Sequence, residues 1–177
     1  MALSAAEENQ LARLLDRVQW PLPKPVFEAL MRKSISVPIE LGVFAHSDDS
    51  ILHVLMVQRP ADDIEFPPLA WHMPGTVIRD TDTIESAMAR LMEGEVGGRV
   101  STPESCGIKE VERGADHPRH AISLLYCTWL KGHGHVEAYD GPGKFFPVNK
   151  LPETTLPHHI VLLREMLKRT GWRGARG

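Results

Sequence analysis

The chain has 177 residues, of which 42% are hydrophobic and 24% are charged. This composition is ordinary for a globular domain and excludes a wholly disordered, collagen-like or coiled-coil protein. With 20 basic and 23 acidic residues the formal net charge is −3, which provides no global electrostatic footprint for nucleic acid or for an anionic membrane.

The N-terminal residues and the two cysteines bear on the cellular compartment of the protein. Glu7 and Glu8 stand where a signal peptide would be basic, and no stretch approaches the roughly 18 apolar residues of a membrane span. Cys106 and Cys127 are too few for a disulfide framework. We therefore expect a cytoplasmic protein with two buried thiols and with neither nucleic acid nor membrane as a partner.

Two helices are predicted at the start of the chain. From Ser4 to Val18 apolar residues recur at helical spacing, which predicts a helix with one buried stripe that begins at Ser4. The proline-rich run WPLPKP breaks it, and a short helix is predicted over 26–32. We assign residues 1–34 to an N-terminal helical extension, 35–170 to the main domain and 171–177 to a flexible tail.

The first half of the main domain begins with a predicted hairpin. Its strands, 37–45 and 51–57, flank the polar turn HSDDS. A proline-rich loop is expected over 60–74 and a second loop of about eight residues after Gly75. A helix over 84–96 then ends at two consecutive glycines, a C-terminal helix signal.

Strands and one more helix are predicted in the second half. The strands are 106–112, 121–130 and 135–138, and an amphipathic helix is expected over 157–168, begun by its proline. Because strands and helices mix without regular alternation, the order favours an α/β sandwich with a mixed sheet.

Residues 71–98 read WHMPGTVIRDTDTIESAMARLMEGEVGG, a Pro-Gly turn, an acidic loop, a helix with an internal arginine, further acids and Gly-Gly. This segment resembles the Nudix box of Nudix hydrolases. The preceding VLMVQRP and the later FFPVNKLPETTLPHHIVLLREML are similar to flanking patterns of that family, so the resemblance covers about residues 37–168. It implies a Nudix-type α/β/α sandwich with a mixed β-sheet.

Alignment of the box on its arginine, Arg90, places Asp82 at the first glutamate of the family pattern and Glu95 at the last. The resemblance implies that Asp82 and Arg90 form a structural pair, that Arg90 and Glu95 are catalytic, and that Glu95 binds Mg²⁺ or Mn²⁺. The family's other two carboxylate positions hold Leu91 and Gly94. Leu91 continues the apolar stripe of the helix, which predicts core packing there.

Other residues are candidates for the site. Glu112, together with Glu110, follows the box where Nudix enzymes often recruit a further base or ligand, so Glu112 is a candidate catalytic residue. By the same resemblance Arg59 contacts a phosphate, and His72 and Gly75 are candidate substrate contacts beside the Pro-Gly turn. Four further histidines are expected on the surface: His133, His135, His158 and His159. Asp116 and His117 are weaker candidates.

These residues are compatible with two different functions. The first is a Mg²⁺-dependent Nudix-type pyrophosphohydrolase that cleaves a nucleoside diphosphate derivative by attack of a metal-oriented water. The second is a catalytically silent Nudix-fold domain that binds a nucleotide-like ligand or a protein partner. Nudix proteins are often dimers, so the resemblance makes a homodimer possible.

Overall fold

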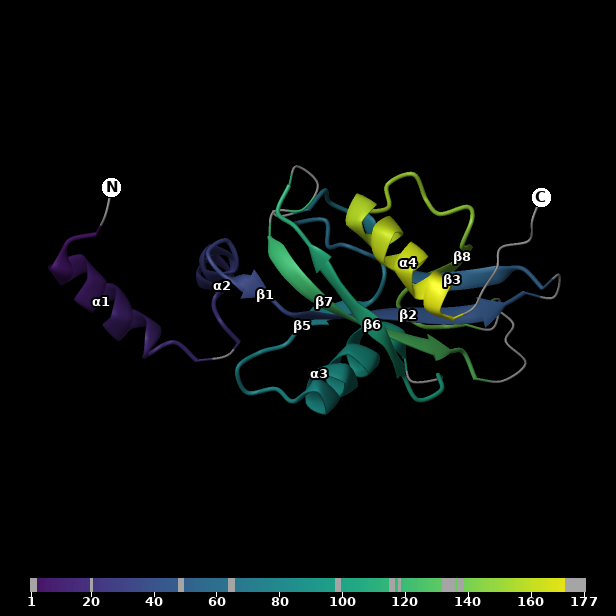
Figure 1. Ribbon diagram of the computed structural model, residues 1–177, viewed down its shortest axis with the longest axis horizontal. Coiled ribbons are helices and arrows are strands. Elements are labelled where there is room, and N and C mark those ends of the chain that lie inside the picture. Colours follow the sequence, from purple (N-terminus) through teal and green to yellow (C-terminus); the bar gives the residue numbers. More distant parts are fainter. Residues whose placement is uncertain are drawn as a thin grey trace. The chain divides into compact units, whose positions relative to one another are not determined.

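The computed structural model (Figure 1) describes residues 3–19, 21–47, 50–63, 66–97, 100–114, 117, 119–131, 136 and 139–170. The chain divides into two compact units, Met1–Lys33 and Ser34–Gly177. The predicted strand over 135–138 and the predicted tail over 171–177 lie outside the described residues, apart from residue 136.

The first unit consists of two helices, α1 (Ala5–Leu15) and α2 (Lys24–Met31). Ser4 caps α1 in a capping box with Glu7, in which each residue's side chain binds the other's backbone N–H. The expected buried stripe is wrong, because none of the residues of α1 is buried. An amphipathic helix buries its apolar stripe only where another element packs on it.

The second unit is built on a mixed eight-stranded sheet. The strands are β1 (Ile35–Ser36), β2 (Pro38–His46), β3 (Leu52–Gln58), β4 (Trp71–His72), β5 (Gly75–Val77), β6 (Glu104–Val111), β7 (His120–Trp129) and β8 (Lys144–Pro147). The central strand, β2, pairs in parallel with β7. It also pairs antiparallel with β5 at its beginning and with β3 at its end.

Four short strands, β1, β4, β5 and β8, were not predicted. β4 and β5 lie within segments expected to be loops, whereas β1 and β8 lie outside every predicted element. Each makes four or fewer pairings with β2, β3 or β7. Strands this short carry too little alternation to be recognised, and they form only because a neighbouring strand supplies hydrogen bonds.

Helices cover both faces of the sheet, as Figure 1 shows. α3 (Ile84–Leu91) and the π-helical segment η1 (Met92–Val96) pack on one face, against Ile39, Leu41 and Val43 of β2. α4 (Pro157–Arg169) packs on the other face, against Phe44. The predicted α/β/α sandwich with a mixed sheet is therefore confirmed.

Gly42 of β2 allows close approach of α4. A Cβ there would lie 2.9 Å from the Met166 sulfur. Because successive strand residues face opposite sides, Glu40, Gly42 and Phe44 share the face covered by α4.

In the part of the chain that the structure describes, no helix combines the length and the apolarity needed to cross a lipid bilayer.

The helix predicted over 84–96 changes geometry partway. It is α-helical to Leu91 and π-helical from Met92 to Val96, where Gly97, with a left-handed φ of 70°, donates its N–H to the Met92 carbonyl oxygen. In a π-helix a residue lies about one turn from the residue five positions later. Leu91 and Val96 are therefore both buried in one cluster, and Glu95 does not belong to it.

Candidate functional site

The three carboxylate positions of the box hold one carboxylate. Leu91 is 2% exposed and packs in the core under α3, and Gly94 is exposed, with no atom within 4 Å of where a Cβ would lie. Glu95 accepts a hydrogen bond from the Gly75 N–H at 3.1 Å through its Oε2. Burial raises the pKa of Glu95, while that hydrogen bond and the Arg59 charge oppose the rise.

Arg90 ties α3 to the strand that precedes it. Its guanidinium forms an ion pair with Asp82 and donates to the Thr76 hydroxyl and, at 3.3 Å, to the Val77 carbonyl oxygen. Asp82 also accepts the Arg79 N–H at 2.9 Å, which is the first cause of its lowered pKa. Thr83 caps α3 in a capping box with Ser86.

A cavity of about 100 Å³ lies next to Gly75, on the α4 side of β2, and we call it the Glu40 pocket. Its walls come from β2, β4, β5, the start of β7 and the start of α4, with residues from the loops after β3 and β6. The ionisable residues that line it are Glu40, Arg59, His72, His117, Arg119, His158 and His159.

Glu40 is the most unusual group in this pocket. It is 7% exposed, and its Oε2 has no hydrogen-bond partner. Nδ1 of His159 lies 3.7 Å from this oxygen, which is beyond hydrogen-bond reach. Burial, reinforced by the charge of Glu95 and opposed by Arg59, raises the pKa of Glu40 to about 8. Glu40 is therefore mainly an uncharged carboxylic acid at pH 7.

Two buried histidines contact Met73 beside Glu40. His72 Nδ1 lies 2.7 Å from the Met73 carbonyl oxygen, which can only accept, so this nitrogen carries the proton. His159 Nδ1 accepts the Met73 N–H at 3.3 Å, which leaves its Nε2 as the protonated nitrogen. Burial lowers the pKa of His72 to about 4 and that of His159 well below its ordinary value. Both rings are neutral at pH 7.

Aromatic rings and arginines complete the pocket. The rings of His158 and His159 are 4.4 Å apart, and His117 stands edge-on to His158 at 4.5 Å. Arg59 lies over the Phe66 ring, 5.2 Å from its centroid, and is paired with Asp63. The second arginine of the pocket, Arg119, is 9% exposed.

The close fit of Gly75 against Glu40 yields a first prediction. The two residues pair across β2 and β5, and a Cβ at Gly75 would lie 2.6 Å from Glu40 Oε2. Gly75→Ala should therefore reduce the free energy of unfolding by about 1 to 3 kcal/mol, measured by urea denaturation. The penalty should shrink when Glu40→Ala is added, because the clashing carboxyl is removed. Gly114→Ala is the control, since no atom lies within 4 Å of its Cβ position; an equal loss there would contradict the steric reason.

The structure gathers some of the predicted site residues and separates others. Arg59, His72 and Gly75 line the Glu40 pocket, and Glu95 reaches it through its hydrogen bond to Gly75. Arg90 binds β5 and Asp82, as described above. Glu112 is exposed after β6 and is not among the described residues that line the pocket.

Glu40 and His159 were missed in the sequence, although each carried a signal. Glu40 is the single acid within the apolar run VPIELGVFA, which is predicted to be a strand. His159 was expected on the surface, but it is 5% exposed and continues the buried row of α4. That row, spaced three and four residues apart, is His159, Leu162, Leu163, Met166 and Leu167. His133 and His135 lie outside the described residues.

The residues present do not fit the metal site that the family resemblance implies. Mg²⁺ and Mn²⁺ prefer several oxygen ligands in octahedral geometry. Leu91 and Gly94 offer no side-chain oxygen, and Glu95 alone remains. Across the described ranges, no group of three or more histidine, cysteine, aspartate or glutamate side chains is arranged to hold a metal ion.

Comparison of the sequence with known protein families and with proteins of characterised function finds no match. Solved structures do match. The Nudix domain of Shewanella oneidensis NrtR, crystallised with ADP ribose, superposes with a TM-score of 0.58 at 18% identity, covering 95% of this chain and 99% of that domain.

A further structure of Shewanella oneidensis NrtR matches with a TM-score of 0.57 at 17% identity over 76% of this chain, and this chain spans only 63% of the length of that one. A mutT/nudix family protein from Listeria innocua has a TM-score of 0.57 at 18% identity, covering 77% of this chain and 94% of that one. These likenesses show that the chain has the Nudix fold.

Proposed function

We propose that this chain is a Nudix-fold binding domain, which holds the phosphates of a nucleoside diphosphate derivative in the Glu40 pocket without hydrolysing them. The observation that carries the proposal is the pocket itself. It combines two arginines with a buried carboxyl that is uncharged at pH 7, whereas the box beside it has lost two of its three carboxylates.

The charges of the pocket favour an anion over a cation. Among the lining residues, Arg119 and Arg59, which also pairs with Asp63, are positive. The buried histidines His72 and His159 are neutral, because burial lowers the pKa of each. The remaining acid on the pocket wall, Glu40, has a pKa of about 8 and so contributes little negative charge at pH 7. Arginine is well suited to phosphate, since its planar N–H groups pair with two oxygens at once.

Glu40 gains a role in this proposal. A buried polar atom without a hydrogen-bond partner costs free energy, and the protonated carboxyl of Glu40 has such an atom facing the pocket. A phosphate oxygen would accept its proton in a hydrogen bond. The negative charge of the phosphate would in turn favour the protonated form.

The ligand class rests on the comparison as well as on the pocket. The NrtR Nudix domain was crystallised with ADP ribose, a nucleoside diphosphate derivative, and this chain shares its fold. Two linked phosphates present several acceptor oxygens, enough to engage both arginines and the neutral Glu40 carboxyl. ADP ribose and ADP are therefore the probes of choice.

Metal-assisted hydrolysis, the competing function, is supported by the retained Glu95 and by neighbours such as a Nudix hydrolase from M. smegmatis. Product analysis distinguishes the two functions. Incubation of ADP ribose and ADP with the protein and Mg²⁺ or Mn²⁺ should release neither AMP nor phosphate. Turnover that Glu95→Gln abolishes would contradict the binding proposal and establish the hydrolase.

Replacing Arg59 tests the binding site. Arg59→Gln should weaken ADP ribose binding, measured by isothermal titration calorimetry, by about ten-fold or more, since charge-assisted hydrogen bonds to phosphate are lost. Binding to the unmodified protein should be the same with EDTA as with Mg²⁺. Arg164→Gln, on the exposed side of α4, is the matched control. Equal affinities for both variants, with thermal melts showing both folded, would place the ligand elsewhere.

A further inference from the structure

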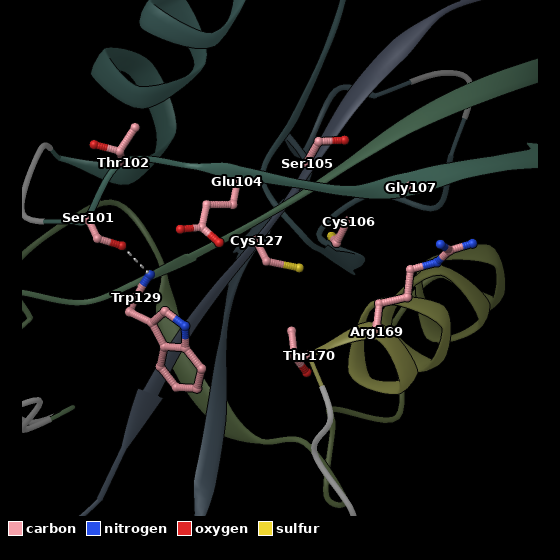
Figure 2. A pocket seen from close by; sticks show the side chains of 10 residues that line it. All are labelled: Ser101, Thr102, Glu104, Ser105, Cys106, Gly107, Cys127, Trp129, Arg169 and Thr170. Atoms are coloured by element: carbon pink, nitrogen blue, oxygen red, sulfur yellow. Dashed lines mark hydrogen bonds between the residues drawn. The ribbon is translucent and has the colours of Figure 1, made fainter.

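A second, larger cavity lies away from the Glu40 pocket, where β6 and β7 meet the end of α4. It measures about 800 Å³, and its walls include both cysteines of the chain, Cys106 and Cys127, together with Glu104 and Arg169 (Figure 2). The sequence places the cysteines far apart, whereas Figure 2 shows their sulfur atoms facing each other between the two strands.

A β-bulge brings the two thiols together. The pairing of β6 with β7 shifts between Ser105 and Gly107, so that Cys106 is the extra residue, while Cys127 lies opposite Glu104. A bulge bends its strand and redirects the side chain of the extra residue. The Cys127 side chain hydrogen-bonds to that of Cys106, and both thiols are free.

The two thiols have different electrostatic surroundings. Arg169 packs over Gly107, which has a left-handed φ of 128° and whose Cβ, if present, would lie 3.0 Å from the guanidinium carbon. The Cys127 hydrogen bond, followed by the Arg169 charge, lowers the pKa of Cys106. Donation of that bond, burial and the Glu104 charge raise the pKa of Cys127.

We propose that Cys106 and Cys127 are a redox-active dithiol, a modification site at which a hydroperoxide entering the 800 Å³ cavity oxidises the pair to a disulfide. Cys106 is the attacking residue, because it is the more exposed of the two and lies beside Arg169. Cys127, which is buried, is the resolving residue.

The reaction balances in two steps. The Cys106 thiolate attacks one oxygen of hydrogen peroxide, the O–O bond breaks, and the departing hydroxide takes a proton and leaves as water. The resulting sulfenic acid then reacts with the Cys127 thiol, so that an S–S bond forms and a second water leaves. Two electrons pass from the thiols to the peroxide in total. The ring closed by the bond spans residues 106–127 and contains His117 and Arg119 of the Glu40 pocket.

Intact-mass analysis tests the site on the full chain. After peroxide treatment, each chain should lose about 2 Da, form no covalent link to another chain, and no longer react with N-ethylmaleimide when denatured. Cys127→Ser should instead gain oxygen at Cys106, and Cys106→Ser should keep an alkylatable Cys127. If both thiols of the unmodified protein stay alkylatable under peroxide that oxidises glutathione, or if only dimers linked between chains form, the proposal is wrong.

The role of Arg169 supplies a second measurement that does not depend on replacing a cysteine. Arg169→Gln should slow alkylation of Cys106 in the native protein by about 3- to 10-fold at pH 7, because less thiolate is present. Arg169→Lys retains the positive charge and should restore most of the rate. Equal rates in all three proteins, with matching thermal melts, would remove the electrostatic basis for Cys106 as the attacking thiol.

Discussion

Leu91→Glu, which restores a family carboxylate, is expected to lower the free energy of unfolding by about 3 to 5 kcal/mol. Leu91 is 2% exposed in the cluster formed by α3, η1 and the β2 residues Ile39, Leu41 and Val43. Glutamate there would lose the packing of leucine and would bring a carboxyl into an apolar core without a partner. Urea denaturation, with circular dichroism as the signal, measures the loss.

Two further variants show whether the cost comes from the core position. Leu91→Met conserves most of the volume and should cost less than about 1.5 kcal/mol. Gly94→Glu places a carboxylate at the other vacant box position, which is exposed and open, and should change stability by no more than about 0.5 kcal/mol. A loss below about 1 kcal/mol for Leu91→Glu would show that this face of the helix remains available for metal ligands.

Glu40→Gln is expected to stabilise the protein at pH 7 by up to about 3 kcal/mol. The folded pKa of Glu40 is about 8 and its ordinary value is 4.5. A raised pKa means that the group's contribution to stability is fully present below pH 4.5 and is lost as the pH rises toward 8. At pH 7 the unfolded chain has released this proton, whereas the folded chain still holds it. Glutamine carries no charge in either state, so it avoids that loss.

The pH dependence distinguishes this effect from simple repacking. The stability difference between Glu40→Gln and the unmodified protein should be near zero at pH 4.5 and grow steadily up to pH 8, in denaturation curves taken at each pH. Arg59, Glu95 and His159 face Glu40 and remain in both proteins, so their own titration largely cancels. Glu153→Gln, at an exposed position, is the control. A difference independent of pH would mean that Glu40 is charged in the folded state.

Glu40→Gln also connects stability with the proposed ligand. If a phosphate oxygen accepts the Glu40 proton, the affinity for ADP ribose should fall as the pH rises through about 8, the pKa of that carboxyl. The amide of glutamine can still donate a hydrogen bond and does not titrate. Its affinity should therefore stay level over the same range, and a parallel fall in both proteins would exclude Glu40 as the donor.

Local sequence determined most of the elements. The capped helices, the long buried strands and the box helix follow from hydrophobic period, proline and glycine signals, and these depend only on neighbours along the chain. The same residues indicated the Nudix fold and the missing carboxylates at Leu91 and Gly94. The spacing of apolar residues alone did not reveal the π-helical end of the box. Residues five positions apart come together there only when Val96 packs beside Leu91 in the core.

Only the tertiary structure decided which side chains meet. Glu40 lies near Gly75 and Glu95 because β2 pairs with β5, and near His159 because α4 covers the face of the sheet on which Glu40 lies. Cys106 meets Cys127 because one bulge changes the register of two strands. Sequence patterns indicate the preferred secondary structure and the burial of each residue. Pairing between distant strands determines which charged side chains surround that residue. For this protein, the elements and the incomplete box could be read from the chain, but the combination of charged and neutral groups in the Glu40 pocket arises from packing.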